Sequence, residues 1–255
     1  MNHKFISIYY NFCEYESKTR LTKEFMKRYP DVHLIELAFG NKPFVINAKN
    51  TTQIRTEFKG FINNEIINQF LSGADSLTFI DSDLILFPNF FEKVIEKVNE
   101  YKDVPLFLQP FSTVQDLSND PKEYCVPKMS AAKKYSLVHF NGHTGHIYTY
   151  NKVFIDQFKK LPTGLLLGGF DTFLWMCLRD DSTGINKLMK NEGILKEILL
   201  FKESCEGVKI DYIEGHISHC FHGNKNKRYH NRMELYDNID QNIIENYFVS
   251  RDEDS

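Results

Sequence analysis

The sequence of 255 residues predicts an α/β protein in which a mostly parallel central sheet is flanked by helices. Short apolar runs of strand length alternate with segments whose apolar residues recur at helical spacing. The first three elements follow the order strand, helix, strand, which favours parallel pairing through a right-handed crossover. Ligands of such sheets bind beyond the carboxyl ends of the strands, so polar residues at those ends are the first candidates for a site.

The first half of the chain carries most of this pattern. Strands are expected at residues 5–10, 33–39, 77–87 and 106–108. Helices are expected at residues 17–29, 61–71 and 90–101, where apolar residues recur every three or four positions. Ser17 is the expected N-cap of the first helix, and Pro30 ends it. The run at 77–87 is unusual because Asp81 and Asp83 interrupt it.

The second half is less regular. Residues 112–135 are polar and contain two prolines, which indicates a surface loop able to order over a substrate. Residues 139–150 have a strand-like pattern, and glycines within it indicate a close approach of the backbone to a neighbour. Further helices are expected from Phe170 onward and through residues 180–208, followed by a short strand at 209–213.

Composition excludes several classes of protein. The 31 basic and 34 acidic residues give a formal net charge of -3, so bulk charge indicates no nucleic-acid binding. No apolar run approaches the roughly 18 residues needed to span a bilayer, and the N-terminus lacks the pattern of a signal peptide. The five cysteines are scattered and odd in number, which favours free thiols. We therefore expect a cytoplasmic protein without a transmembrane segment.

The paired carboxylates of Asp81 and Asp83 indicate a divalent cation. Charge within an apolar run is costly unless a cation or hydrogen-bond donors meet it. Residues i and i+2 of a strand point the same way, so both carboxylates can face one ion if the strand continues; if it turns, one can act through water. Oxygen ligands favour Mg²⁺ or Mn²⁺, which commonly use one or two carboxylates together with substrate phosphates. The alternative is that either aspartate bonds the turn before the helix that follows Pro88.

A basic, histidine-rich segment near the C-terminus can complete such a site. One imidazole could join the ion, and the cationic side chains could reach a diphosphate. The histidines are His216, His219 and His222, and the cations are Lys225, Lys227, Arg228 and Arg232. An independent zinc site on the three histidines is the rival interpretation, but their spacing fits neither a helix nor one face of a strand.

Four segments together resemble the nucleotide-sugar-dependent glycosyltransferases of GT-A fold. The first is Tyr9-Tyr10-Asn11 with Ser17-Lys18-Thr19-Arg20, and the second is Glu36 to Gly40 with Pro43-Phe44 and Gln53-Ile54-Arg55. The third is Phe79-Ile80-Asp81-Ser82-Asp83, and the fourth is Gly168-Gly169-Phe170-Asp171 with His219-Cys220-Phe221-His222-Gly223 and Arg228-Tyr229. The likeness extends from Tyr9 to about Tyr236.

The resemblance implies one domain over residues 1–255, with a nucleotide-binding half at 1–110, an acceptor and catalytic half at 111–249 and a frayed tail at 250–255. It implies Mn²⁺ or Mg²⁺ on Asp81, Asp83 and His222, with His219 in reserve, and Asp171 as the general base of an inverting transfer. Implied donor-binding residues are Tyr10, Asn11, Arg20, Phe39, Arg55, Ser82, Lys225, Lys227 and Arg228. Implied acceptor-binding residues are Gly168, Gly169 and Phe170.

The implied donor is a nucleoside diphosphate sugar, with uridine as the default base, and the acceptor is a glycan, a lipid-linked saccharide or a glycoprotein. Two other functions remain open from the sequence. A sugar-phosphate nucleotidyltransferase could use a similar sheet and paired aspartates, although the loop after the first strand lacks the glycines expected of a phosphate loop. A non-catalytic carbohydrate-binding protein could retain the same fold.

Overall fold

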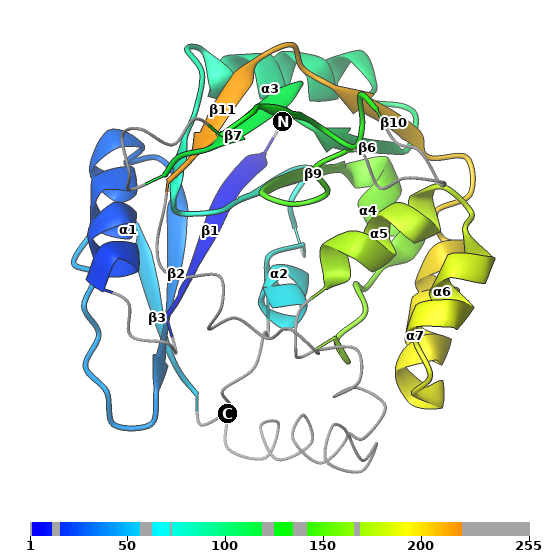
Figure 1. Ribbon diagram of the computed structural model, residues 1–255, viewed down its shortest axis with the longest axis horizontal. Coiled ribbons are helices and arrows are strands. Elements are labelled where there is room, and N and C mark those ends of the chain that lie inside the picture. The colour runs from blue at the N-terminus through cyan, green and yellow to red at the C-terminus, as the bar shows by residue number, and fades with distance from the viewer. Residues whose placement is uncertain are drawn as a thin grey trace.

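The computed structural model describes residues 2–11, 16–56, 63–71, 73–118, 125–134, 142–165 and 169–220 (Figure 1). The strands of the larger sheet are β1 (His3–Tyr10), β2 (His33–Phe39), β3 (Thr51–Thr56), β4 (Ser76–Ile80), β6 (Leu106–Gln109), β9 (Ile147–Asn151) and β10 (Lys209–Tyr212). Those of the smaller sheet are β5 (Leu84–Ile85), β7 (Thr113–Asp116), β8 (Lys128–Met129) and β11 (His216–His219). The helices are α1 (Glu16–Arg28), α2 (Asn63–Leu71), α3 (Phe90–Glu100), α4 (Lys152–Phe158), α5 (Phe170–Leu178), α6 (Ser182–Leu188) and α7 (Glu192–Glu203).

The larger sheet is mixed and mostly parallel. Its strand order is β10-β6-β9-β4-β1-β2-β3, and β1 pairs in parallel with both β2 and β4. Only β9 among its named strands runs antiparallel to its neighbours, which are β4 and β6. The predicted α/β class, with a mostly parallel sheet flanked by helices, is confirmed.

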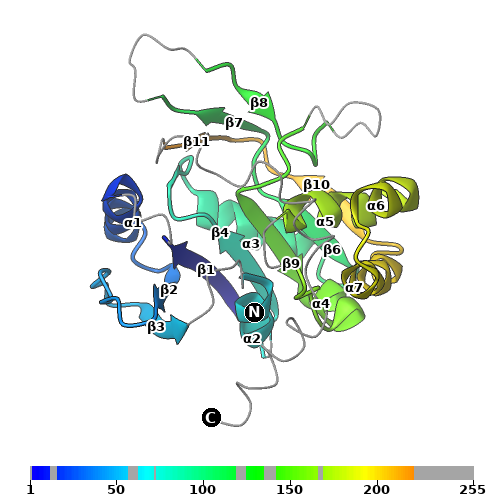
Figure 2. The same cartoon turned by 60° about the horizontal axis from the view of Figure 1, so that its bottom comes forward.

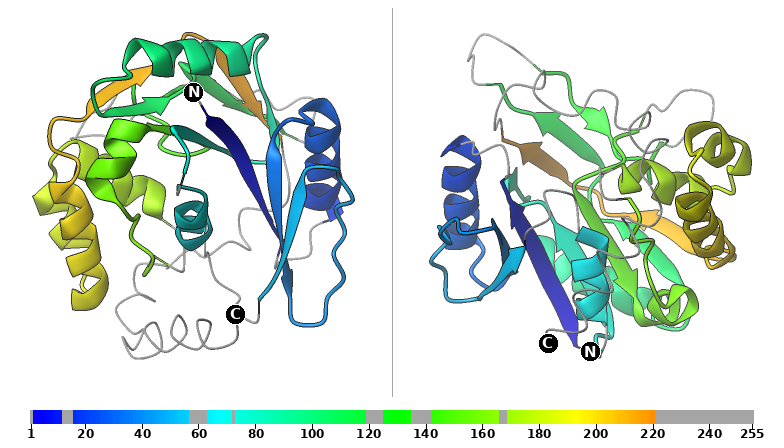
Figure 3. Two further views of the ribbon diagram at one scale, coloured as in Figure 1. Left: turned by 180° about the vertical axis from the view of Figure 1, so that it is seen from behind. Right: turned by 90° about the horizontal axis from the view of Figure 1, so that it is seen from below.

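Both faces of the larger sheet are covered by apolar side chains. Ile6, Ile8 and Tyr10 of β1 pack into one core cluster, together with residues of α2, α4, α5, α6 and α7. Tyr9 packs into a second cluster, with residues of α1, α3 and the small sheet. Alternate residues of a strand point to opposite faces, so β1 is buried on both sides. Figure 3 shows α1 and α7 at opposite sides of the molecule.

The smaller sheet, in the order β5-β11-β7-β8, lies across one end of the larger sheet (Figure 2). Its central strand, β11, pairs antiparallel with β5 and parallel with β7. Three segments that are far apart in the sequence therefore meet there. Two of its strands carry Asp116 and His219.

Four predicted boundaries were wrong. Helix α1 begins at Glu16, so Ser17 lies inside the helix and is not its N-cap. Residues 51–56 form the strand β3, for which no strand was expected, because they pair with β2 along their whole length. The run at 77–87 is split, since β4 ends at Ile80 and the chain turns before β5 enters the other sheet. The expected loop at 112–135 contains β7 and β8.

No helix in the described part of the chain is long and apolar enough to cross a bilayer. The four cysteines that the structure describes, at positions 125, 177, 205 and 220, are free thiols.

The folded protein should lose stability in mild acid because of His3. Its ring nitrogens bond the hydroxyl oxygens of Ser76 at 2.5 Å and Thr78 at 2.9 Å. Burial lowers the pKa of His3 from 6.5 to about 4, so the neutral ring is favoured in the folded state. The stability that the neutral His3 ring contributes is complete above pH 6.5 and is lost as the pH falls toward 4. The loss amounts to about 2 kcal/mol at pH 5. Urea unfolding of His3→Gln, which cannot titrate, should show a smaller loss between pH 7.5 and 5 than the wild type.

Candidate metal and catalytic site

The two aspartates of the predicted motif lie at the carboxyl end of β4. The backbone N–H of Asp81 donates to the carbonyl of His146 at 2.9 Å, which continues the pairing of β4 with β9 for one more residue. The chain then turns, and the carbonyl of Asp83 accepts from the N–H of Cys220 at 2.9 Å. Since the strand does not continue, the two carboxylates meet different neighbours. Asp83 is buried and the side chain of Asp81 is 38% exposed.

The register of β11 places His219 among carboxylates. His219 pairs with Asp116 of β7 on one side and with Leu84 of β5 on the other. Its Nδ1 lies 2.9 Å from Asp116 Oδ1, and its Nε2 lies 3.7 Å from Asp83 Oδ1. Burial opposes protonation of the ring, but the hydrogen bonds with Asp116 and Asp83 outweigh it and raise the pKa of His219 to about 9. The hydrogen bond with His219 holds the pKa of Asp116 well below its usual range.

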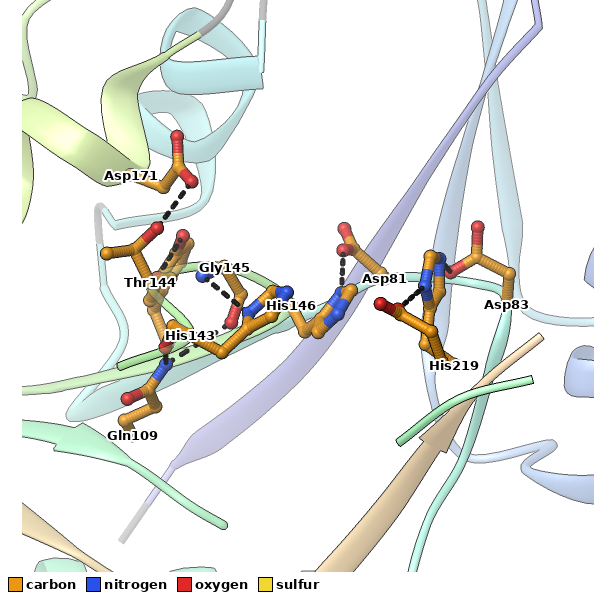
Figure 4. Close-up of polar contacts among 11 residues, drawn as sticks. Asp81, Asp83, Gln109, His143, Thr144, Gly145, His146, Asp171 and His219 are labelled. Atoms are coloured by element: carbon orange, nitrogen blue, oxygen red, sulfur yellow. Dashed lines mark hydrogen bonds and ion pairs between the residues drawn. The ribbon is translucent and has the colours of Figure 1, made fainter. Parts of the chain in front are cut away.

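His146 lies beside His219 and is held by Asp81. Its Nδ1 is 3.0 Å from Asp81 Oδ2, and its ring centroid is 4.4 Å from that of His219. On its other side the ring stacks on His143, with centroids 4.2 Å apart. Burial, helped by the neighbouring His146, lowers the pKa of His143 to about 3, so this ring is neutral and its Nδ1 accepts from the N–H of Gly145. Figure 4 shows the three imidazoles in a row.

Asp171 faces the same cleft from the first turn of α5. The hydroxyl of Thr144 donates to Asp171 Oδ2 at 2.8 Å (Figure 4). The carbonyl of Thr144 is itself fixed by Tyr148 Oη at 2.9 Å and by Trp175 Nε1 at 3.0 Å. The N-cap Gly169 has φ +90° and contributes no side-chain hydrogen bond to the start of α5.

A cleft of about 400 Å³ joins these groups. Asp81, Asp116, His146 and His219 line one part of it, and Asp171 another, with Gly169 and Phe170 beside Asp171. Tyr148, which also lines the cleft, is close to both Asp81 and Asp171. Burial first, and then these two carboxylates, raise the pKa of its hydroxyl well above 10. The cleft therefore has imidazole and carboxylate side chains able to bind a metal, and a separate carboxylate, within one space.

The loop that carries Thr144 and His146 is held closely against the segment after β8. A Cβ on Gly142 would lie 2.6 Å from Ala131 Cα and 2.8 Å from the carbonyl oxygen of Lys134, both backbone atoms. This agrees with the close backbone approach that the glycines predicted. The amide of Gln109 reinforces the loop by donating to the carbonyl of His143 at 2.9 Å.

Gly142→Ala should therefore lower the free energy of unfolding by about 1–3 kcal/mol, the usual cost of overpacking. Gly145→Ala is the matched control, because the nearest atom to its new Cβ would be His143 Cε1 at 3.4 Å. Urea denaturation followed by circular dichroism measures both. Equal stability of the two variants would contradict the close contact at Gly142.

A second, smaller pocket of about 210 Å³ lies at the end of β1 and β2. Asn11, predicted for the donor, lines it and donates through Nδ2 to Tyr9 Oη at 3.1 Å. Glu36 is buried in its wall and accepts from the N–H groups of Val45 at 2.5 Å and Ile46 at 3.0 Å. These hydrogen bonds hold both side chains, Asn11 through a hydroxyl and Glu36 through backbone donors.

The other predicted donor residues have different positions. The side chain of Tyr10 is buried in the first core cluster, and Arg20 is exposed on α1. Arg55 donates to the carbonyls of Gly40 and Lys42, and its guanidinium lies over the ring of Phe44. Ser82 is buried, with its hydroxyl 2.9 Å from that of Thr22, which ties the aspartate turn to α1. None of these four residues lines the smaller pocket.

Several predicted residues lie outside the described part of the chain. They are Gly168, His222, Lys225, Lys227 and Arg228, and for Phe39 only the backbone is described. His216, by contrast, is exposed on β11 with its Nδ1 3.0 Å from Thr113 Oγ1, and it does not line the cleft.

The sequence did not point to Asp116, His143, Thr144 or His146 as site residues. Asp116 comes to the site through pairing with a strand about 100 positions later in the chain, which no local pattern reveals. His143 and His146 lie inside the run expected at 139–150, which indicated only a close approach of the backbone.

The side chains present fit a divalent cation. Asp116, His146 and His219 each offer a ligand atom, and these atoms lie within 4.8 Å of one another. His146 Nε2 is buried and has no hydrogen-bond partner among the described residues. Two imidazoles and carboxylates form a donor set that suits a first-row dication.

Comparisons with known proteins give likeness of structure only. No protein-family model matches the chain, and no curated protein matches it. The S. aureus protein TarS 1–349 in complex with UDP-GlcNAc is 12% identical, with 90% of this chain and 62% of that chain covered and a TM-score of 0.47. GalNAc-T7 with UDP, GalNAc and Mn²⁺ is 11% identical, with 88% and 44% covered and a TM-score of 0.49.

A protein assigned as a glucose-1-phosphate thymidylyltransferase from Bacillus anthracis, in complex with a sucrose, is 12% identical, with 93% of this chain and 96% of that chain covered and a TM-score of 0.40. The chain spans less than two thirds of the length of the TarS and GalNAc-T7 chains. The assignment to the α/β class therefore depends on the strand order of the chain itself.

Proposed function

We propose that the protein is a metal-dependent glycosyltransferase of GT-A fold that moves a sugar from a nucleoside diphosphate sugar to an acceptor hydroxyl. The observation that carries the proposal is the single cleft that has an imidazole and carboxylate cluster in one part and the carboxylate of Asp171 in another. The sequence resemblance described above supports the same reading. The domain is proposed to extend over residues 1–255, with nucleotide binding in the first 110.

The metal end of the cleft is proposed to hold the diphosphate of the donor. By resemblance, Asp81, Asp83 and His222 would hold Mn²⁺ or Mg²⁺, with His219 in reserve, and the basic residues that follow His222 would contact the diphosphate. When bound, the ion neutralises the charge that builds on the departing diphosphate. Backbone hydrogen bonds with His146 and Cys220 hold the main chain of Asp81 and Asp83 in place.

Asp171 is proposed as the general base. The hydrogen bond from Thr144 fixes one carboxylate oxygen at 2.8 Å, which leaves the other oxygen to accept a proton. The acceptor hydroxyl then attacks the anomeric carbon while its proton passes to Asp171, and the bond from that carbon to the diphosphate oxygen breaks. The transition state is oxocarbenium-like, and one displacement inverts the anomeric centre. Gly169 and Phe170, beside Asp171, are proposed to contact the acceptor.

The smaller pocket is proposed to receive the nucleoside of the donor. Asn11 and Glu36 offer it polar atoms that are fixed by their hydrogen bonds, and uridine is the proposed base by resemblance. The acceptor is proposed to be a glycan, a lipid-linked saccharide or a glycoprotein.

The test is incubation of the purified chain with a panel of nucleotide sugars, Mn²⁺ and simple glycoside acceptors. Release of nucleoside diphosphate together with a glycosylated acceptor supports the proposal. Release of pyrophosphate from nucleoside triphosphates and sugar phosphates would identify a nucleotidyltransferase instead. Binding of saccharide without any turnover would identify a carbohydrate-binding protein.

A further inference from the structure

The tautomer of the neutral His146 ring is set by its contact with Asp81. Nδ1 lies 3.0 Å from the carboxylate of Asp81, which can only accept when ionised, so Nδ1 carries the proton in the neutral ring. The lone pair is then on Nε2. Nε2 is buried, has no hydrogen-bond partner among the described residues, and belongs to a side chain that is 8% exposed and lines the cleft. A buried nitrogen lone pair without a partner is costly unless a ligand meets it.

The backbone of His146 supports a role for its side chain. Its φ is +81°, in the left-handed region that glycine adopts without strain and other residues adopt rarely. The carbonyl of His146 accepts from the N–H of Asp81, so Asp81 holds both the backbone and the ring. A strained conformation that persists under two contacts is typical of functional positions.

The neighbours of Nε2 are the other members of a ligand set. Ligand atoms of Asp116 and His219 lie within 4.8 Å of that of His146 and of each other. Around one ion at about 2.1 Å, such atoms stand roughly 3.0–3.5 Å apart, so shifts of about 1 Å would close the set. The Asp81 carboxylate behind His146 repeats the carboxylate-histidine arrangement that orients metal ligands.

We propose that the ion binds His146 Nε2, one nitrogen of His219 and the Asp116 carboxylate. In this ligand set Asp81, which the resemblance makes a ligand, instead orients His146 from behind, and Asp83 lies beside His219 without binding the ion. This rests on the proposed function for the use of the ion, because the donor diphosphate would take its open positions. Two imidazoles and one carboxylate prefer Zn²⁺, Co²⁺ or Mn²⁺ to Mg²⁺, which favours oxygen ligands. This ligand set therefore discriminates against Mg²⁺, whereas the paired aspartates alone would not.

The test uses metal ions alone, without nucleotide. Isothermal titration calorimetry of the metal-free full chain with Zn²⁺, Mn²⁺ and Mg²⁺ should give affinity in that descending order. His146→Gly removes the ring and also suits the positive φ, so the fold should be retained. We expect Zn²⁺ affinity to fall by more than about 100-fold in this variant and by about 10–100-fold in Asp81→Asn, the usual range for an orienting partner. The matched control is His216→Ala, which changes an exposed histidine on the same strand as His219. This variant should bind Zn²⁺ as the wild type does.

A second readout identifies the nitrogen ligands. The visible absorption of bound Co²⁺ should change in position and intensity in His146→Gly but not in His216→Ala. Unchanged Zn²⁺ affinity in His146→Gly, or tighter binding of Mg²⁺ than of Zn²⁺, would overturn the inference. The proposed function fails separately, if ions bind through His146 but no nucleotide sugar is turned over.

Discussion

Asp171→Asn is expected to retain the nucleotide-sugar donor while turnover falls by about 10²–10⁴-fold, the usual contribution of a general base. The substitution keeps the shape of the side chain and still accepts the hydrogen bond from Thr144, but the amide cannot take the acceptor proton. Donor affinity should therefore stay near that of the wild type. Steady-state release of nucleoside diphosphate gives the turnover, and calorimetry with the unreactive nucleoside diphosphate gives the affinity.

The control for this substitution is Asp156→Asn on α4, whose carboxylate pairs with Lys152 at the surface. It should leave both quantities unchanged. Full turnover in Asp171→Asn would remove this residue from the mechanism. A product in which the anomeric configuration is retained, as read by NMR, would also contradict its assignment as the base of a single displacement.

Asp83→Ala is expected to abolish metal-dependent binding of a nucleoside diphosphate. The side chain is buried and lies 3.7 Å from His219, so its removal takes away a carboxylate beside the proposed cation site. Calorimetric titration of nucleoside diphosphate in the presence of Mn²⁺ should give no measurable heat of binding. Chelation of the metal from the wild type should produce the same loss.

Asp83→Asn separates loss of charge from loss of packing, because it conserves the volume of the side chain and should also lose most of the affinity. Asp103→Ala, an exposed aspartate after α3, should bind normally. If Asp83→Ala binds nucleoside diphosphate with unchanged affinity in Mn²⁺, the carboxylate has no part in holding the donor.

Elements that pack by their own apolar pattern could be predicted from the sequence. The prediction at 33–39 matches β2, because the apolar run ends at a glycine. This glycine, Gly40, has φ +52° and ends the strand. The helix expected at 90–101 is α3, whose Phe90, Val94 and Val98 are all buried. Strands β7 and β8 were missed because their residues are polar, and only pairing with partners elsewhere in the chain makes them strands.

The same distinction applies to the residues of the candidate site. Asp81, Asp83 and Asp171 follow or begin elements that the local pattern predicts, so they could be named as candidates. Asp116 and His146 could not, because what brings them to the cleft is a register between strands and a positive φ. Tyr10 was placed in the donor pocket by resemblance, yet its side chain faces the core and its neighbour Tyr9 lines the pocket.

The position of β11 in the middle of the small sheet affects the order in which the two sheets can form during translation. Its partners β5 and β7 are made about 130 and about 100 residues earlier, and they do not pair with one another among the named strands of this sheet. A nascent chain that has just left the ribosome with Asp83 and Asp116 therefore still lacks the strand that joins them. The larger sheet, apart from its edge strand β10, can form first, and the proposed cation site is complete only after the last described strand has been made.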